Sequence, residues 1–141
     1  MNRPAALLVA TLAFAVHAPA ARACGYCIED KIASVYDHAA ITRALAKKHH
    51  VAFFALDGQT AAGASTKRAL EQIAESVPGA DAGSARASVE NASLSVAFDP
   101  ARVPYASLMR QLEKKLAPKG LAPMPLRVMD RPADLKALVR S

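Results

Sequence analysis

The order in which hydrophobic patterns change along residues 50–129 constrains the fold more than any other feature of this chain. Short apolar or alternating segments predict strands, and segments with apolar side chains at helical spacing predict helices. The predicted strands are 51–56, 85–89, 93–98 and 124–129, and the predicted helices are 66–77 and the segment between Pro104 and Pro118. Glu90-Asn91-Ala92 joins the second and third strands as a hairpin turn. The order is therefore strand, helix, strand, strand, helix, strand.

This order is that of the ferredoxin-like split βαβ arrangement. We expect an α+β domain at 50–129, in which a four-stranded antiparallel sheet is backed by two helices on one face. Apolar residues at helical spacing predict an extra N-terminal helix over 27–48, bent near 39–42, within an N-terminal segment that spans 24–49. Residues 130–141 are predicted as a polar C-terminal tail that holds one short helix.

The third predicted strand and its following turn carry a family resemblance. The segment from Ala92 to Val103, with Phe-Asp-Pro at 98–100, resembles the heavy-metal-associated domains of copper chaperones and metal-transporting ATPases. The resemblance covers about residues 50–129 and implies a metal-handling fold. That family places Gly-Met-x-Cys-x-x-Cys in the loop after its first strand. Here Gly58 aligns with the glycine, but Ala61 and Ala64 stand at the two cysteine positions. Alanine offers a metal no lone pair, so the usual site is absent.

The first 23 residues read as a secretory signal peptide. A short positive start is followed by an apolar run at 5–16, a helix-breaking Pro19, and Ala21-Arg22-Ala23 just before Cys24. The apolar run is shorter than the roughly 20 residues that span a bilayer. We therefore expect cleavage after residue 23. The mature protein is then expected to be periplasmic or secreted and no longer attached to the membrane. An uncleaved membrane anchor and a lipid on Cys24 are the alternatives.

Charge and composition exclude several classes of function. Loss of Arg3 and Arg22 with the signal lowers the net charge from +6 to +4, and the remaining charges are scattered, which argues against nucleic-acid binding. The densest basic stretch, 47–50, is interpreted as a solvated helix end. Glu71 and Glu75 lie one helical turn apart on a face predicted to be solvated. No catalytic motif is present, so an enzyme is not indicated unless the cysteines are redox-active.

Cys24-Gly25-Tyr26-Cys27 is the chemically distinctive motif. Three hypotheses remain open for it. Two thiolates suit a soft ion such as Cu(I), which makes Cys24 and Cys27 metal ligands in a protein that serves a metal transporter or another periplasmic protein. The pair would instead be catalytic in a thiol–disulfide exchange protein. In the third hypothesis they form a structural disulfide in a non-metal binding module, whose sheet or loop 58–65 contacts a partner protein.

Other soft ligands are weaker candidates. His38 follows Cys27 by 11 residues, or roughly 16 Å along a continuous helix, so we expect a surface or hydrogen-bonded histidine rather than a ligand. Met109 fits the apolar stripe of its helix and is expected in the core. Met124 and Met129 have opposite parity in the last strand, which predicts that they face opposite sides of the sheet.

Overall fold

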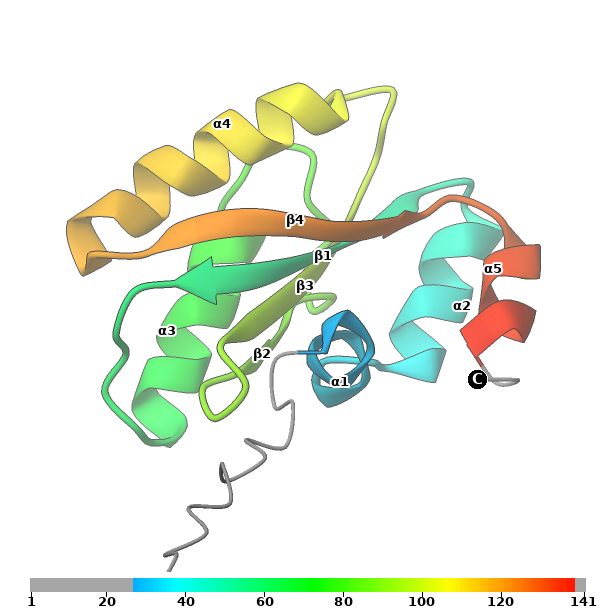
Figure 1. Cartoon of the computed structure of the whole chain (residues 1–141). Coiled ribbons are helices and arrows are strands. Elements are labelled where there is room, and N and C mark those ends of the chain that lie inside the picture. The colour runs from blue at the N-terminus through cyan, green and yellow to red at the C-terminus, as the bar shows by residue number, and fades with distance from the viewer. Residues whose placement is uncertain (1–26, 139–141) are drawn as a thin grey trace, which may run out of the picture.

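The computed structural model describes residues 27–138 and confirms an α+β fold with one four-stranded antiparallel sheet (Figure 1). The strands are β1 (His50–Asp57), β2 (Arg86–Ser88), β3 (Ser93–Phe98) and β4 (Ala122–Met129). The helices are α1 (Ile28–Ser34), α2 (His38–Ala46), α3 (Ala64–Glu75), α4 (Tyr105–Leu116) and α5 (Pro132–Leu138), with a 3₁₀ turn, η1 (Ala117–Lys119). No helix in this part of the chain is both long and apolar enough to cross a bilayer.

The sheet has the strand order β2-β3-β1-β4, and every neighbouring pair is antiparallel. β1 lies in the interior, between β3 and β4. Its odd-numbered and even-numbered side chains point to opposite faces of the sheet, because successive residues of a strand alternate. Phe53 and Phe54 are therefore neighbours in sequence that serve different cores, and neither is exposed.

Helices α3 and α4 cover the first face of the sheet, as predicted. Their apolar stripes pack on the even-numbered residues of β1 and β3, and this interior is called the first cluster. Its buried members are Ala52, Phe54, Leu56, Leu70, Ala74, Val77, Ala85, Ala87, Leu94, Val96, Phe98, Val103, Leu108, Leu112, Leu116 and Leu121. Tyr105 at the start of α4 stacks on Phe54, with ring centroids 6.4 Å apart.

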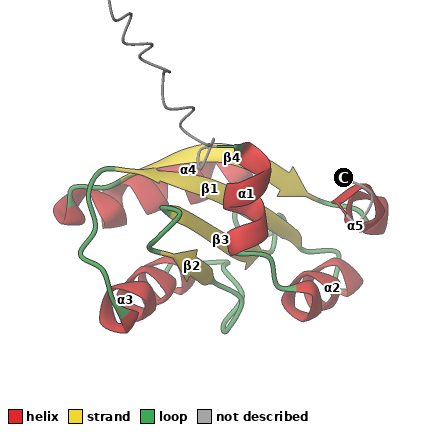
Figure 2. Cartoon of the chain, turned by 60° about the horizontal axis from the view of Figure 1, so that its bottom comes forward, coloured by secondary structure: helices red, strands yellow, loops and turns green. Residues whose placement is uncertain are grey.

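Helices α1, α2 and α5 cover the second face, which the sequence pattern did not predict (Figure 2). This interior is called the second cluster. Its buried members are Ile32, Val35, Ile41, Ala44, Leu45, Val51, Phe53, Ala97 and Met129. Leu135 of α5 also packs against it, so the short helix expected in the C-terminal segment is present and lies against the sheet.

The prediction of one helix over 27–48, bent near 39–42, is wrong. The chain forms two helices, and the break lies earlier, at residues 35–37. Asp37 adopts an extended conformation, and its side chain accepts a hydrogen bond from the backbone N–H of Ala40 at 2.9 Å. A carboxylate in this position satisfies a donor that a new helix leaves open, which favours a helix start over continuation. The break lets α1 and α2 lie on the sheet in different directions (Figure 2).

The prediction that Met124 and Met129 face opposite sides of the sheet is also wrong. Phe53 pairs with Arg127 but Phe54 pairs with Pro125, so β4 carries one extra residue at this point. Such a bulge shifts the alternation by one position. Met124 then stands opposite Ala55 and Met129 opposite Val51, which places both on the second face.

Candidate functional site

Cys27 stands at the entrance to α1, as the sequence predicted. It is the N-cap residue in an extended conformation, and its carbonyl accepts the first backbone hydrogen bond of the helix, from Lys31. The side chain is exposed and forms no disulfide within the described residues. Cys24 lies outside the described residues, so the structure gives the position of only one of the two sulfurs.

Polar contacts hold α1, and with it Cys27, against the sheet. Lys31 is buried, and its ammonium group donates to the backbone carbonyls of Asn91 and Ala92 in the turn between β2 and β3. At the end of the helix, the hydroxyls of Ser34 and Ser93 lie 2.7 Å apart. Cys27 therefore stands at the start of a helix whose last turn is fixed to β3 and to the turn that connects β2 and β3.

The surroundings of the α1 start include exposed apolar and charged side chains. Glu29, two residues after Cys27, forms an ion pair with Arg127 of β4. Ile28 is 51% exposed, and Met124, on the same face of the sheet, is 53% exposed. Most large apolar side chains of the described chain are buried, so Ile28 of α1 and Met124 of β4 stand out as exposed ones.

Loop 58–63 connects β1 to α3. Gly58 has φ +119°, and a Cβ added there would lie 2.3 Å from the carbonyl oxygen of Gly120. Only glycine permits this approach, because any side chain would collide with the backbone. Ala61 and Ala64 bring no ligand atoms. Within residues 27–138, no group of three His, Cys, Asp or Glu side chains is placed to hold a metal ion.

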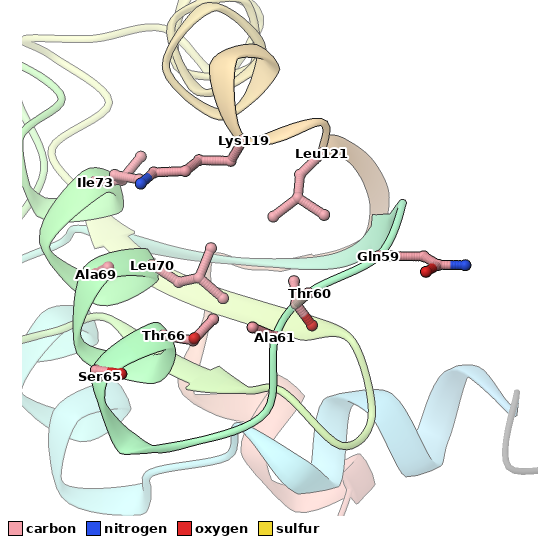
Figure 3. A pocket seen from close by; sticks show the side chains of 10 residues that line it. All are labelled: Gln59, Thr60, Ala61, Ser65, Thr66, Ala69, Leu70, Ile73, Lys119 and Leu121. Carbon is pink, nitrogen blue, oxygen red and sulfur yellow. The ribbon is translucent and has the colours of Figure 1, made fainter.

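A hollow of about 350 Å³ opens beside this loop, between α3 and the connection from η1 to β4 (Figure 3). Sequence analysis did not find it, because its walls come from three separate segments. Gly58 and Gly120 are the sequence signals that accompany it, since their close contact brings the loop and the η1 end together.

Among the described histidines, His38 and His49 have partners other than Cys27. His38 is exposed, and its Nδ1 lies 3.1 Å from the hydroxyl of Tyr36, which confirms the expected hydrogen-bonded surface role. His49 directly precedes β1. Its Nδ1 lies 2.9 Å from each carboxylate oxygen of Asp81, and its Nε2 lies 3.8 Å from the carboxylate of Asp99. The basic stretch 47–50 is therefore not wholly solvated, because His49 links the end of α2 to the loops around the sheet.

Glu71 and Glu75 have a role that differs from the predicted one. Their carboxylates accept hydrogen bonds from the backbone N–H groups of Ala87 and Ala85, at 3.1 Å each. β2 is an edge strand, and an edge exposes N–H groups that invite pairing with another chain. The two glutamates of α3 satisfy these donors, so they close a sheet edge rather than facing only solvent.

Comparisons with known proteins give no independent guide to this site. No family model matches the chain, and no curated protein or solved structure shows significant similarity to it.

Proposed function

We propose that this chain is an exported metal-binding or metal-delivery protein that holds a soft ion such as Cu(I) between Cys24 and Cys27. The observation that carries the proposal is the exposed Cys27 at the start of a helix fixed to the sheet. A second cysteine three residues earlier brings another thiolate within reach. Two thiolates suit Cu(I), whereas Zn²⁺ normally takes four ligands.

The topology supports the further proposal that residues 50–129 form a ferredoxin-like domain of the heavy-metal-associated kind. β1 and β2 run parallel with β3 between them and are connected through α3. β3 and β4 are likewise parallel with β1 between them and are connected through α4. Two interleaved split βαβ units with both helices on one face are typical of this fold. The displaced motif at 24–27 would then replace the cysteines that loop 58–63 lacks.

The setting we propose is the periplasm or the exterior of the cell after signal cleavage, with a metal transporter or another periplasmic protein as the partner. A delivery protein must load and release its ion, which favours a surface site with few ligands over an enclosed one. The exposed Cys27 fits that requirement.

Competition for Cu(I) tests this function. The mature chain, starting at Cys24 and fully reduced, should withdraw one equivalent of Cu(I) from a coloured chelator. Cys24→Ser and Cys27→Ser should each weaken uptake by at least tenfold. His38→Ala is the matched control, and it should bind as the unaltered chain does because His38 is committed to Tyr36. Uptake that survives both serine substitutions, or no uptake by the reduced chain, rejects the proposal.

Thiol–disulfide exchange is the second candidate, because an accessible Cys27 that opens a helix also suits that chemistry. Cys24 and Cys27 would lose two electrons and two protons to the disulfide of a partner, which would be reduced to two thiols. The reduction potential of the Cys24–Cys27 pair distinguishes thiol–disulfide exchange from a structural disulfide. A value below about −300 mV marks a structural disulfide and rejects exchange.

A non-metal binding module is the third candidate, and the structure limits which surface would contact its partner. Helices pack on both faces of the described sheet, and Met124 of β4 is an exposed part of the second face. Loop 58–63 and the hollow beside it remain accessible.

A further inference from the structure

We propose that the hollow beside loop 58–63 binds a small amphiphilic carboxylate, meaning a carboxylic acid anion with a short hydrocarbon body. This inference goes beyond metal binding. The hollow adjoins α3 on the first face of the sheet, whereas Cys27 begins α1 on the second face. Its volume of about 350 Å³ falls at the small end of the range usual for ligand pockets.

The floor of the hollow is apolar and already formed. Leu70 and Leu121 are almost fully buried members of the first cluster, and Ile73 packs against the same cluster. Figure 3 shows Leu121 extending into the space between loop 58–63 and α3. Because core packing fixes these side chains, the floor would not need to rearrange for a hydrocarbon to lie on it.

The rim of the hollow is polar and carries one kind of charge. Thr60, Ser65 and Thr66 supply hydroxyl groups, and Lys119 supplies an ammonium group. No carboxylate lines the hollow, and among the described residues no carboxylate forms an ion pair with Lys119. Lys119 is the only charged side chain among the described residues that line the hollow, so the hollow favours an anionic over a cationic head group.

Local geometry determines where the Lys119 side chain leaves the backbone. Lys119 ends η1, and Gly120 follows it in the left-handed conformation with φ +70°. The contact of Gly58 with the Gly120 carbonyl then fixes this turn against loop 58–63. In Figure 3 the Lys119 side chain extends across the top of the hollow toward Ile73, so its charge lies over the apolar floor. An ammonium group above a hydrocarbon surface matches a molecule with a carboxylate at one end and a short chain at the other.

Nuclear magnetic resonance titration of the mature chain with octanoate tests this site. Saturable shifts should be confined to the amides of 59–61, 65–73 and 119–121. Octan-1-ol has a comparable chain but no charge, and inorganic phosphate has charge but no chain, so each should bind at least tenfold more weakly than octanoate. Shifts spread over the whole surface, or phosphate binding as tight as octanoate, would overturn the proposal.

Two variants test separately how the charge and the shape of the hollow contribute to octanoate binding. Lys119→Ala should weaken octanoate binding about tenfold, whereas Lys115→Ala, an exposed lysine in the last turn of α4, should leave it unchanged. Ala69→Leu keeps every charge but fills the hollow from α3, and it should abolish the saturable shifts. Lys119 is exposed and Ala69 is partly exposed, so both variants should keep the fold. Equal binding by Lys119→Ala and Lys115→Ala rejects the site.

Discussion

The first face of the sheet is closed by 16 buried apolar side chains among the described residues, and the second face by nine. The second face also depends on polar contacts that span the layer. Ser95 donates to the Val35 carbonyl at 3.0 Å, Ser34 meets Ser93, and Arg86 of β2 binds Asp37 at 2.7 Å. Apolar packing covers the first face of the sheet, whereas the second face combines a smaller apolar core with specific hydrogen bonds.

This difference indicates that the two helical layers respond differently to destabilising substitutions. Burial of apolar surface is non-directional, and in the first cluster it is shared among many side chains. Hydrogen bonds need correct geometry, and a buried group that loses its partner keeps its full desolvation cost. We expect α1 and α2 to detach before the rest of the sheet opens. Three sets of variants test this expectation, in order of decreasing effect.

The largest effect is expected from the neighbouring phenylalanines of β1. Phe54→Ala should lower the free energy of unfolding by about 3–5 kcal/mol, because it opens a cavity in the larger cluster and removes the stacking on Tyr105. Phe53→Ala should cost less, near the lower end of that range, and should first expose the amides of α1 and α2. Urea unfolding gives the stabilities, and hydrogen exchange shows which amides open. Simultaneous exchange of both layers in both variants would contradict the comparison.

A smaller effect is expected from Ser95. Ser95→Ala removes the donor to the buried Val35 carbonyl and should cost about 1–3 kcal/mol in urea unfolding. Ser76→Ala is the matched control, since that hydroxyl also donates to a backbone carbonyl, of Ile73, but lies at the surface. It should change stability by less than about 0.5 kcal/mol. Equal costs for the two serines would show that the polar contacts of the second face contribute little.

The smallest effect is expected from Asp37, and it depends on pH. The hydrogen bond from the Ala40 N–H, followed by that from Arg86, lowers the pKa of Asp37 below its ordinary value. Because the folded pKa is the lower one, the carboxylate stabilises the fold above the unfolded pKa of about 3.9, and this contribution is lost as pH falls through the folded pKa. Asp37→Ala should cost about 1 kcal/mol at pH 7 through the lost cap.

Asp37→Asn separates the cap from the charge. Asparagine caps a helix as well as aspartate, so this variant should be more stable than Asp37→Ala at pH 7. It should also lose less stability than the unaltered chain between pH 4 and pH 2. Urea unfolding across that range measures both. Identical acid profiles for the asparagine variant and the unaltered chain would contradict the assigned role of the carboxylate.

Sequence reasoning succeeded where the signal was local. The apolar run before Asp57-Gly58 predicted β1, and the turn-like segment Glu90-Asn91-Ala92 predicted the hairpin. The helical stripes of α3 and α4 were also recognised. At the candidate site, the same local reasoning placed Cys27 at the start of a helix and His38 at the surface. It missed the break at 35–37, because the apolar pattern continues across this segment and the capping side chain of Asp37 is the local signal that opposes it.

The remaining features depend on contacts between distant segments. A bulge decides the face of Met124, and it arises only when β4 pairs with β1. Glu71 and Glu75 bind the edge of β2, although their spacing resembles that of any solvated helix face. The hollow needs loop 58–63, α3 and the η1 end together. None of these features leaves a periodic trace in the sequence.

The sequence by itself determined the order and type of the elements around the sheet and the thiol spacing at 24–27. These follow from hydrophobic periodicity and turn chemistry, which act over a few residues. The tertiary structure decided that a second helical layer covers the sheet, that Ser93 and Ser95 are buried with partners, and that Gly58 meets Gly120. The physical reason is that burial and hydrogen bonding in these places are satisfied by residues many positions away, so no short stretch of sequence encodes them.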